Sequence, residues 1–302
     1  MTASQHAHGA HAHDHATRAH DHAGSPDDAM TSLLDLDGEV LSGYWSAALD
    51  WVAGAAASAA NNAANSAADN AGRLLDLGAG TGTGALGLAE RFPRAEVIAV
   101  DVEPGSLARL RDKARARGLA GRVRAVAADL DAGWPDLGPL DLTWASMSLH
   151  HLAEPGRVLA DALAATRPGG LIAAAEFAEP LRFLRPAAVP AGFEDRLLDR
   201  LGRAHAEAMP TLGSAWAPRL AAAGWEVAGE REFPVDLDPP AHPRAAEYAR
   251  AWFARLSEGL ADQLEPADQA TLTALLAGDG PLSPADLRIR GTRTVTLARR
   301  PR

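Results

Sequence analysis

The sequence contains no cysteine and only one lysine, Lys113. Without thiols the chain cannot form disulfides, thiolate zinc sites or iron–sulfur clusters, and it has no thiol nucleophile. With so little lysine, a Walker-type phosphate loop, a Schiff-base lysine at a strand end and a Tyr-x-x-x-Lys reductase dyad all lack their reagent. These two absences exclude several large classes of enzyme.

Long apolar runs and excess positive charge are also missing. No stretch of about eighteen apolar residues occurs, and no basic-then-apolar signal pattern opens the chain. The net charge of −10 repels phosphate backbones, so we expect neither a membrane nor a nucleic-acid partner. The composition, 47% hydrophobic, suffices for a packed core, and we expect a cytoplasmic protein.

Residues 1–28 carry seven of the eleven histidines but show no apolar periodicity. This pattern predicts a disordered tail that could bind divalent metal ions weakly, and metal handling is one alternative for the main function. Residues 29–72 are predicted to form an amphipathic helix from Met30 to about Val52, followed by an Ala/Asn/Ser-rich linker. That helix could cover a site or mediate a homodimer.

From residue 73 to 302 short apolar runs alternate with segments of helical period. Strands are predicted near 73–78, 95–101, 122–128, 139–146 and 170–177, with helices near 83–92, 104–117 and 155–166 between them. This order predicts an α/β fold with a Rossmann-like, doubly wound sheet that is mostly parallel. Strands at 225–235 and 292–297 would add an antiparallel C-terminal strand, and helical insertions are expected at about 178–223 and 237–290.

Acidic residues and glycines follow the first three predicted strands. The run Asp76-x-Gly78-x-Gly80-x-Gly82 ends a strand in a glycine loop, where a ligand can approach the backbone closely. Asp101 ends the second strand and could accept both hydroxyls of a ribose, while Asp129 follows the third and could accept an adenine amine. Asp76 disfavours a pyrophosphate but suits a ligand that carries an ammonium and a sulfonium.

These residues resemble the motifs of class I S-adenosylmethionine-dependent methyltransferases, especially the small-molecule group that includes quinone-biosynthesis enzymes. The resemblance covers about Leu74 to Phe177 and includes Asp141–Leu152, similar to the fourth strand and methionine-holding turn, and Arg167–Gly170 before the fifth strand. It implies S-adenosylmethionine as cofactor, S-adenosylhomocysteine as product and a small-molecule acceptor. The implied cofactor-binding residues are Asp76, Gly78, Ala79, Gly80, Gly82, Asp101, Val102, Asp129, Leu130, Ser146, Met147 and His151.

Candidates for the acceptor site lie where the carboxyl edge of the sheet meets the helical caps. His150 and Glu176 are candidate general bases, although His150 and His151 could instead pack against the site or shape it. Tyr44, Trp45, Phe177 and Arg182 are candidate substrate contacts. No metal site is expected in the folded domain, and neither the acceptor nor the methylated atom follows from these residues.

Two further hypotheses remain from the sequence. The run Gly80-x-Gly82-x-x-Ala85 also fits a relaxed dinucleotide fingerprint, so an NAD(P)-dependent oxidoreductase is an alternative. The domain could also bind S-adenosylmethionine without transferring its methyl group, because the binding and alignment residues are the same ones.

Overall fold

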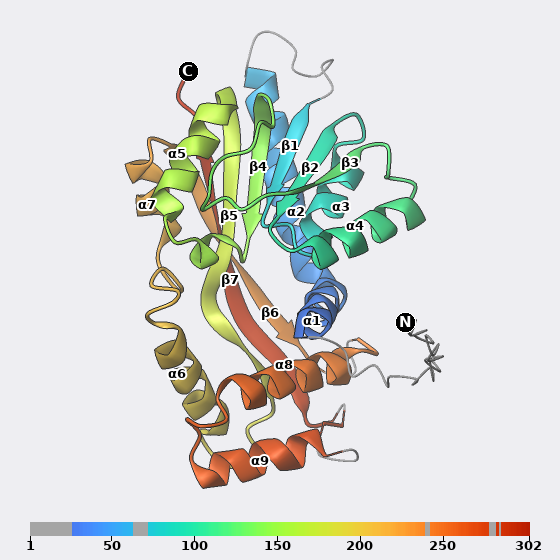
Figure 1. Cartoon of the computed structure of the whole chain (residues 1–302), viewed down its shortest axis with the longest axis vertical. Helices are drawn as coiled ribbons and strands as arrows, with labels where there is room; N and C mark the ends of the chain where they lie inside the picture. Colours follow the sequence, from blue (N-terminus) through green and yellow to red (C-terminus); the bar gives the residue numbers. More distant parts are fainter. Residues whose placement is uncertain (1–25, 63–71, 239–241, 278–281, 284) are drawn as a thin grey trace, which may run out of the picture.

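The computed structural model describes residues 26–62, 72–238, 242–277, 282–283 and 285–302. Its centre is a seven-stranded sheet in the order β3-β2-β1-β4-β5-β7-β6 (Figure 1). All neighbouring strands are parallel except β7, which runs antiparallel to both β5 and β6. The predicted Rossmann-like fold is therefore confirmed. The strands are β1 Arg73–Leu77, β2 Glu96–Asp101, β3 Val123–Ala127, β4 Leu140–Ser146, β5 Thr166–Leu184, β6 Glu226–Leu237 and β7 Leu287–Arg299.

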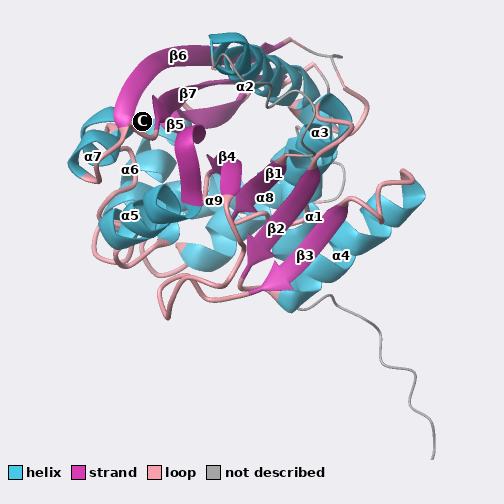
Figure 2. Cartoon of the chain, turned by 90° about the horizontal axis from the view of Figure 1, so that it is seen from above, coloured by secondary structure: helices cyan, strands magenta, loops and turns pink. Residues whose placement is uncertain are grey.

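Helices cover both faces of this sheet (Figure 2). Successive residues of a strand point to opposite faces, so Leu74 of β1 joins one core and its neighbour Leu75 joins the other. The first core includes side chains of α2 (Ser42–Asn62), α3 and α4, and the second those of α5 and α7 (Trp216–Ala222). The crossover helices are α3 Thr83–Arg91, α4 Pro104–Ala116 and α5 Pro155–Ala165.

Three strands continue past the carboxyl edge of the others and carry a helical cap (Figure 1). β5 does not end at Phe177 as expected but runs to Leu184, because β7 remains paired with it through several bulges as far as Leu287. Residues 178–184, which were expected to begin a helical insertion, therefore belong to a strand. None of the helices in the described part of the chain combines the length and apolar character needed to cross a membrane. The cap helices are α6 Phe193–His205, α8 Ala245–Gly259 and α9 Pro266–Leu276, whereas α7 packs on the sheet beside α5.

The N-terminal segment forms two helices rather than the single one expected. α1 spans Pro26–Val40 and α2 spans Ser42–Asn62, with a turn at Leu41 between them. α2 extends into the segment that was expected to be a linker. α1 begins within the expected tail, so residues 26–28 are helical. Residues 1–25, with all seven tail histidines, and residues 63–71 lie outside the described part of the chain. α1 packs against α2, α4 and α8.

A buried ion pair fastens α1 to the sheet and the cap. Asp37 of α1 accepts hydrogen bonds from the Arg293 guanidinium on β7, at 2.5 and 3.2 Å, and from the Tyr248 hydroxyl on α8, at 2.7 Å. The Trp45 indole of α2 donates to the same carboxylate. The Arg293 side chain is only 2% exposed, so Asp37 balances a charge that water cannot reach.

Removing this carboxylate should weaken the whole fold. We expect Asp37→Ala to lower the free energy of unfolding by roughly 3 kcal/mol or more, because it leaves a buried guanidinium without its counter-charge. Asp50→Ala is the matched control, since it removes an ion pair to Arg91 in which the carboxylate is 65% exposed, and it should change little. Urea unfolding followed by circular dichroism measures both, and equal small losses would contradict the assigned role of Asp37.

Candidate functional site

The glycine loop between β1 and α3 is held from two sides. Gly78 and Ala79 donate backbone hydrogen bonds to the carbonyl of Val100 on β2. Gly78 has a φ of +69°, and a Cβ there would lie 2.3 Å from Cβ of Ser148, in the turn after β4. The Ser148 hydroxyl itself donates to the carbonyl of Leu77 at 2.7 Å. Only glycine fits this close approach, so the loop and the turn after β4 form one unit.

Asp76 lies fully buried beneath this loop, and its Oδ2 has no hydrogen-bond partner among the described residues. The indole Nε1 of Trp144 on β4 is likewise without one. A Cβ on Gly84 would lie 2.7 Å from Oδ2 of Asp76 and 2.8 Å from Nε1 of Trp144, so both atoms border the same small space. Burial, with Asp101 nearby, raises the pKa of Asp76 to about 7. An unsatisfied buried carboxylate suits a cationic ligand group such as an ammonium or sulfonium.

The other predicted acidic residues lie at the same edge of the sheet. Asp101 accepts hydrogen bonds from the backbone of Gly80 at 2.7 Å and of Glu103 at 2.9 Å. It is near enough to Asp76 to affect the pKa of that residue. Beside it Val102 is 59% exposed, an uncovered apolar side chain at the end of β2. These features fit a ribose and the face of a purine ring.

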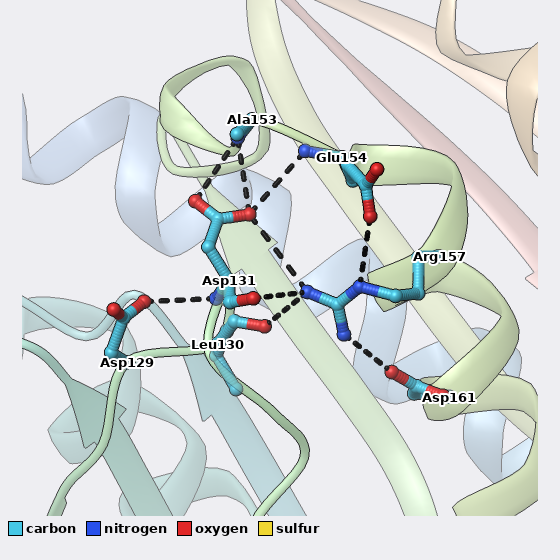
Figure 3. Close-up of polar contacts among 7 residues, drawn as sticks. All are labelled: Asp129, Leu130, Asp131, Ala153, Glu154, Arg157 and Asp161. Atoms are coloured by element: carbon cyan, nitrogen blue, oxygen red, sulfur yellow. Dashed lines mark hydrogen bonds and ion pairs between the residues drawn. The ribbon is translucent and has the colours of Figure 1, made fainter.

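Asp129 and Leu130 follow β3, in a turn that an arginine fixes (Figure 3). Asp129 accepts a hydrogen bond from the backbone of Asp131 at 2.9 Å, which leaves other lone pairs of its exposed carboxylate available. Arg157 of α5 donates to the carbonyls of Leu130 and Asp131, and the Asp131 carboxylate accepts from the backbone of Ala153. The turn after β3 is thereby tied to the segment after β4. Asp131 and Arg157 were not predicted as part of this site, because no local sequence motif marks either residue.

A buried histidine in the turn after β4 and a glutamate within β5 form a pair. Nδ1 of His150 lies 2.5 Å from Oε2 of Glu176, and Oε1 of Glu176 accepts a hydrogen bond from the backbone of Leu149 at 3.0 Å. Both side chains are about 5% exposed or less. An ionised Glu176 accepts the proton of Nδ1, so Nε2 of His150 carries the free lone pair. This arrangement can orient a general base.

The cap brings further groups to this pair. The His151 ring lies beside that of His150, with centroids 4.3 Å apart and the planes tilted by 40°, and the Phe177 ring lies 5.8 Å from the His150 ring. Although part of His151 reaches solvent, burial of the rest of the ring lowers its pKa to about 4. His150, His205 of α6 and Arg255 of α8 add to that effect. His151 is therefore neutral at physiological pH, and the cap contributes residues that no local motif indicated.

The predicted contacts from α2 also reach this edge. The Trp45 ring lies 6.2 Å from that of Trp144, and the Tyr44 ring lies 4.6 Å from the Arg293 guanidinium. Ser146 ends β4, and Met147, which follows it, has the only positive φ of a described residue other than glycine, at 53°. Arg182 differs from the other candidates, because its guanidinium pairs with Asp195 of α6 at 2.5 Å. Among the described residues no group of three or more side chains could hold a metal ion.

Comparison with known proteins agrees with this geometry. Residues 74–170 match a family model described as a methyltransferase domain. A malonyl-[acyl-carrier protein] O-methyltransferase of Laribacter hongkongensis is 41% identical over 33% of this chain and 35% of its own length. A demethylmenaquinone methyltransferase of Thermus thermophilus is 40% identical over 36% of this chain and 48% of its own length. The chain thus spans less than half the length of either relative.

A solved structure extends the likeness to the whole fold. A protein of Bacillus halodurans described as a methyltransferase superposes with a TM-score of 0.50, covering 82% of this chain and 99% of its own, at 16% identity. That likeness shows the fold alone, while the family model spans the glycine loop and the acidic residues described above. Residues 74–170 are therefore similar to the methyltransferase domain of S-adenosylmethionine-dependent methyltransferases.

Proposed function

We propose that the protein transfers a methyl group from S-adenosylmethionine to a small-molecule acceptor. The observation that carries the proposal is the fully buried carboxylate of Asp76, whose Oδ2 has no hydrogen-bond partner among the described residues and which lies beneath the glycine loop and close to Asp101. A pyrophosphate would be repelled at this position, which argues against a dinucleotide-dependent oxidoreductase.

Each cofactor contact is assigned by the chemistry of the residue. Asp101 would accept the ribose hydroxyls, Asp129 the adenine amine, and Asp76 would face the ammonium and the sulfonium. Val102 and Leu130 would pack on the two sides of the purine. Close backbone approach would come from Gly78, Ala79, Gly80 and Gly82, and contacts to the methionine part from Ser146, Met147 and His151.

The main task of the protein in this reaction is alignment. Bound S-adenosylmethionine supplies a methyl group on a positively charged sulfur, which is already a good leaving group. The chain must hold the acceptor atom in line with that methyl and exclude water, and positioning of this kind can lower a barrier by roughly 7 to 11 kcal/mol. The rigid unit of glycine loop and β4 turn supports such positioning.

His150 and Glu176 would remove a proton from the acceptor. Nε2 of His150 would accept it, while the Glu176 carboxylate holds Nδ1 and balances the imidazolium charge. Phe177, Tyr44 and Trp45 would line the acceptor pocket. Arg182 would first have to leave its ion pair with Asp195. The relatives are named for different acceptors, a malonyl group and demethylmenaquinone, so the family alone leaves the acceptor open.

Cofactor affinity should depend on pH through Asp76. Its pKa is about 7, so below that pH the carboxyl is neutral and must lose its proton to face a cationic ligand. We expect the affinity for S-adenosylhomocysteine to rise by up to about tenfold per pH unit as the pH approaches 7, and to level off above it. Calorimetric titration at pH 6, 7 and 8 measures this.

Two variants test whether Asp76 is the group that causes this pH dependence. Asp76→Asn should bind more weakly at pH 8 and lose the pH dependence, whereas Asp129→Asn should bind more weakly but keep it. An affinity of the unmodified protein that stays constant across this range would contradict the placement of Asp76 beside the cationic part of the cofactor.

Loss of the His150–Glu176 pair should slow methyl transfer without weakening cofactor binding. In Glu176→Gln the amide would donate to Nδ1 and leave the proton on Nε2, the wrong tautomer for a base. We expect this variant and His150→Ala to transfer methyl about 10²- to 10⁴-fold more slowly to acceptors that must lose a proton.

The assay follows labelled methyl from S-adenosylmethionine into a panel of hydroxyl, amine and acidic-carbon acceptors. Glu179→Gln is the matched control, because this exposed residue of the same strand bonds only Thr292 among the contacts that the structure describes. Unchanged rates in both dyad variants would remove the two residues as bases.

A further inference from the structure

Three hydrogen-bonding groups without partners lie in the interior, one at the end of β4, one in the middle of β7 and one on α2. They are Nε of Arg293, the hydroxyl of Tyr44 and the hydroxyl of Ser146, all inaccessible to water and none with a hydrogen-bond partner in the described part of the chain. Such groups are rare in native interiors, because burial removes the hydrogen bonds they would make with water. Their grouping suggests that a ligand satisfies them together.

Arg293 presents one edge of its guanidinium to this place. Its two terminal nitrogens donate to the two oxygens of Asp37, which leaves the Nε edge of the planar group unpaired. Two aromatic rings lie near the guanidinium, with the centroids of Tyr44 and Phe177 4.6 and 5.8 Å from its central carbon. The unpaired Nε edge remains to bind a ligand, and such an edge matches a carboxylate oxygen.

Tyr44 and Ser146 lie beside that edge. Burial raises the pKa of Tyr44, while the nearby Arg293 and Ser146 partly offset this rise, so the hydroxyl stays protonated and can donate. No well-formed hydrogen bond links the Tyr44 hydroxyl to either neighbour, although both are close. Tyr44 thus lies next to both other residues, and the three unpaired polar groups are gathered in one region of the interior.

This position adjoins the proposed acceptor site. The ring of Phe177 lies 5.8 Å from the Arg293 guanidinium and 5.8 Å from the ring of His150. A group bound at the donors would thus be separated from the general base by one aromatic ring. Asp37 already balances the arginine, so a bound carboxylate adds one net negative charge and a dianionic phosphate adds two, which makes the phosphate the poorer fit.

We propose that Arg293, Tyr44 and Ser146 form a carboxylate-binding subsite that borders the acceptor site. This inference rests on the proposed function and deepens it, since the subsite would make the acceptor a carboxylic acid where it serves the acceptor. The same chemistry occurs in the methionine part of the cofactor, whose carboxylate is the other source the experiment must distinguish.

The test removes each free donor while it leaves the internal contacts in place. Tyr44→Phe and Ser146→Ala delete only unpartnered hydroxyls, so the melting temperature without ligand should not fall. Arg293→Lys keeps the charge beside Asp37 but loses the free edge. Tyr248→Phe is the matched control, because it deletes a hydroxyl that bonds Asp37, and it should lower the melting temperature without affecting carboxylate binding.

Three probes are titrated calorimetrically into each variant. They are S-adenosylhomocysteine, methylthioadenosine, which lacks the amino-acid part, and malonate added to protein saturated with S-adenosylhomocysteine. If the subsite serves the acceptor, Tyr44→Phe and Arg293→Lys weaken malonate about tenfold or more and leave the two nucleosides unchanged. If it serves the cofactor, they weaken S-adenosylhomocysteine by that factor but not methylthioadenosine.

Either of those results supports the carboxylate subsite. The proposed subsite is overturned if Tyr44→Phe and Arg293→Lys bind S-adenosylhomocysteine with unchanged affinity and malonate either does not bind or binds all variants equally. The proposed methyl transfer fails on a different result, namely that the unmodified protein binds neither S-adenosylhomocysteine nor methylthioadenosine.

Discussion

The buried charge of Arg293 links parts of the molecule that are far apart in sequence. Its partner Asp37 comes from α1, its covering rings from α2 and β5, and the Tyr248 hydroxyl that completes the network from α8. A guanidinium this deeply buried is stable only while all of these groups remain in place. The N-terminal helices, the sheet and the cap therefore meet at one point, next to the edge where the candidate site lies.

At that edge the structure keeps polar atoms that its own residues do not satisfy. Asp76 and Trp144 lie under the glycine loop, while Tyr44, Ser146 and the Nε edge of Arg293 lie nearer the cap. Interiors built only for stability pair such atoms or replace them. We interpret the first group as the place for the cationic part of a cofactor and the second as the place for an anion.

Much of this architecture follows from local patterns in the sequence. The alternating strands, the glycine loop and Asp101 depend on neighbours within one βαβ unit, so short segments sufficed to predict them. The extension of β5 to Leu184 was not predictable in this way, because it depends on pairing with β7. Arg293 appeared only as one polar residue in an alternating strand, since Asp37 lies 256 positions away in the chain. The turn at Leu41 was likewise hidden within a continuous amphipathic pattern.

The most direct measurement is a crystal structure of the protein with S-adenosylhomocysteine bound. We expect the adenosine between Asp101 and Asp129, the amino group near Asp76, and the sulfur facing Phe177 and His150. A ligand bound elsewhere, or one at this edge that leaves Asp76 and Asp101 without contacts, would contradict the account.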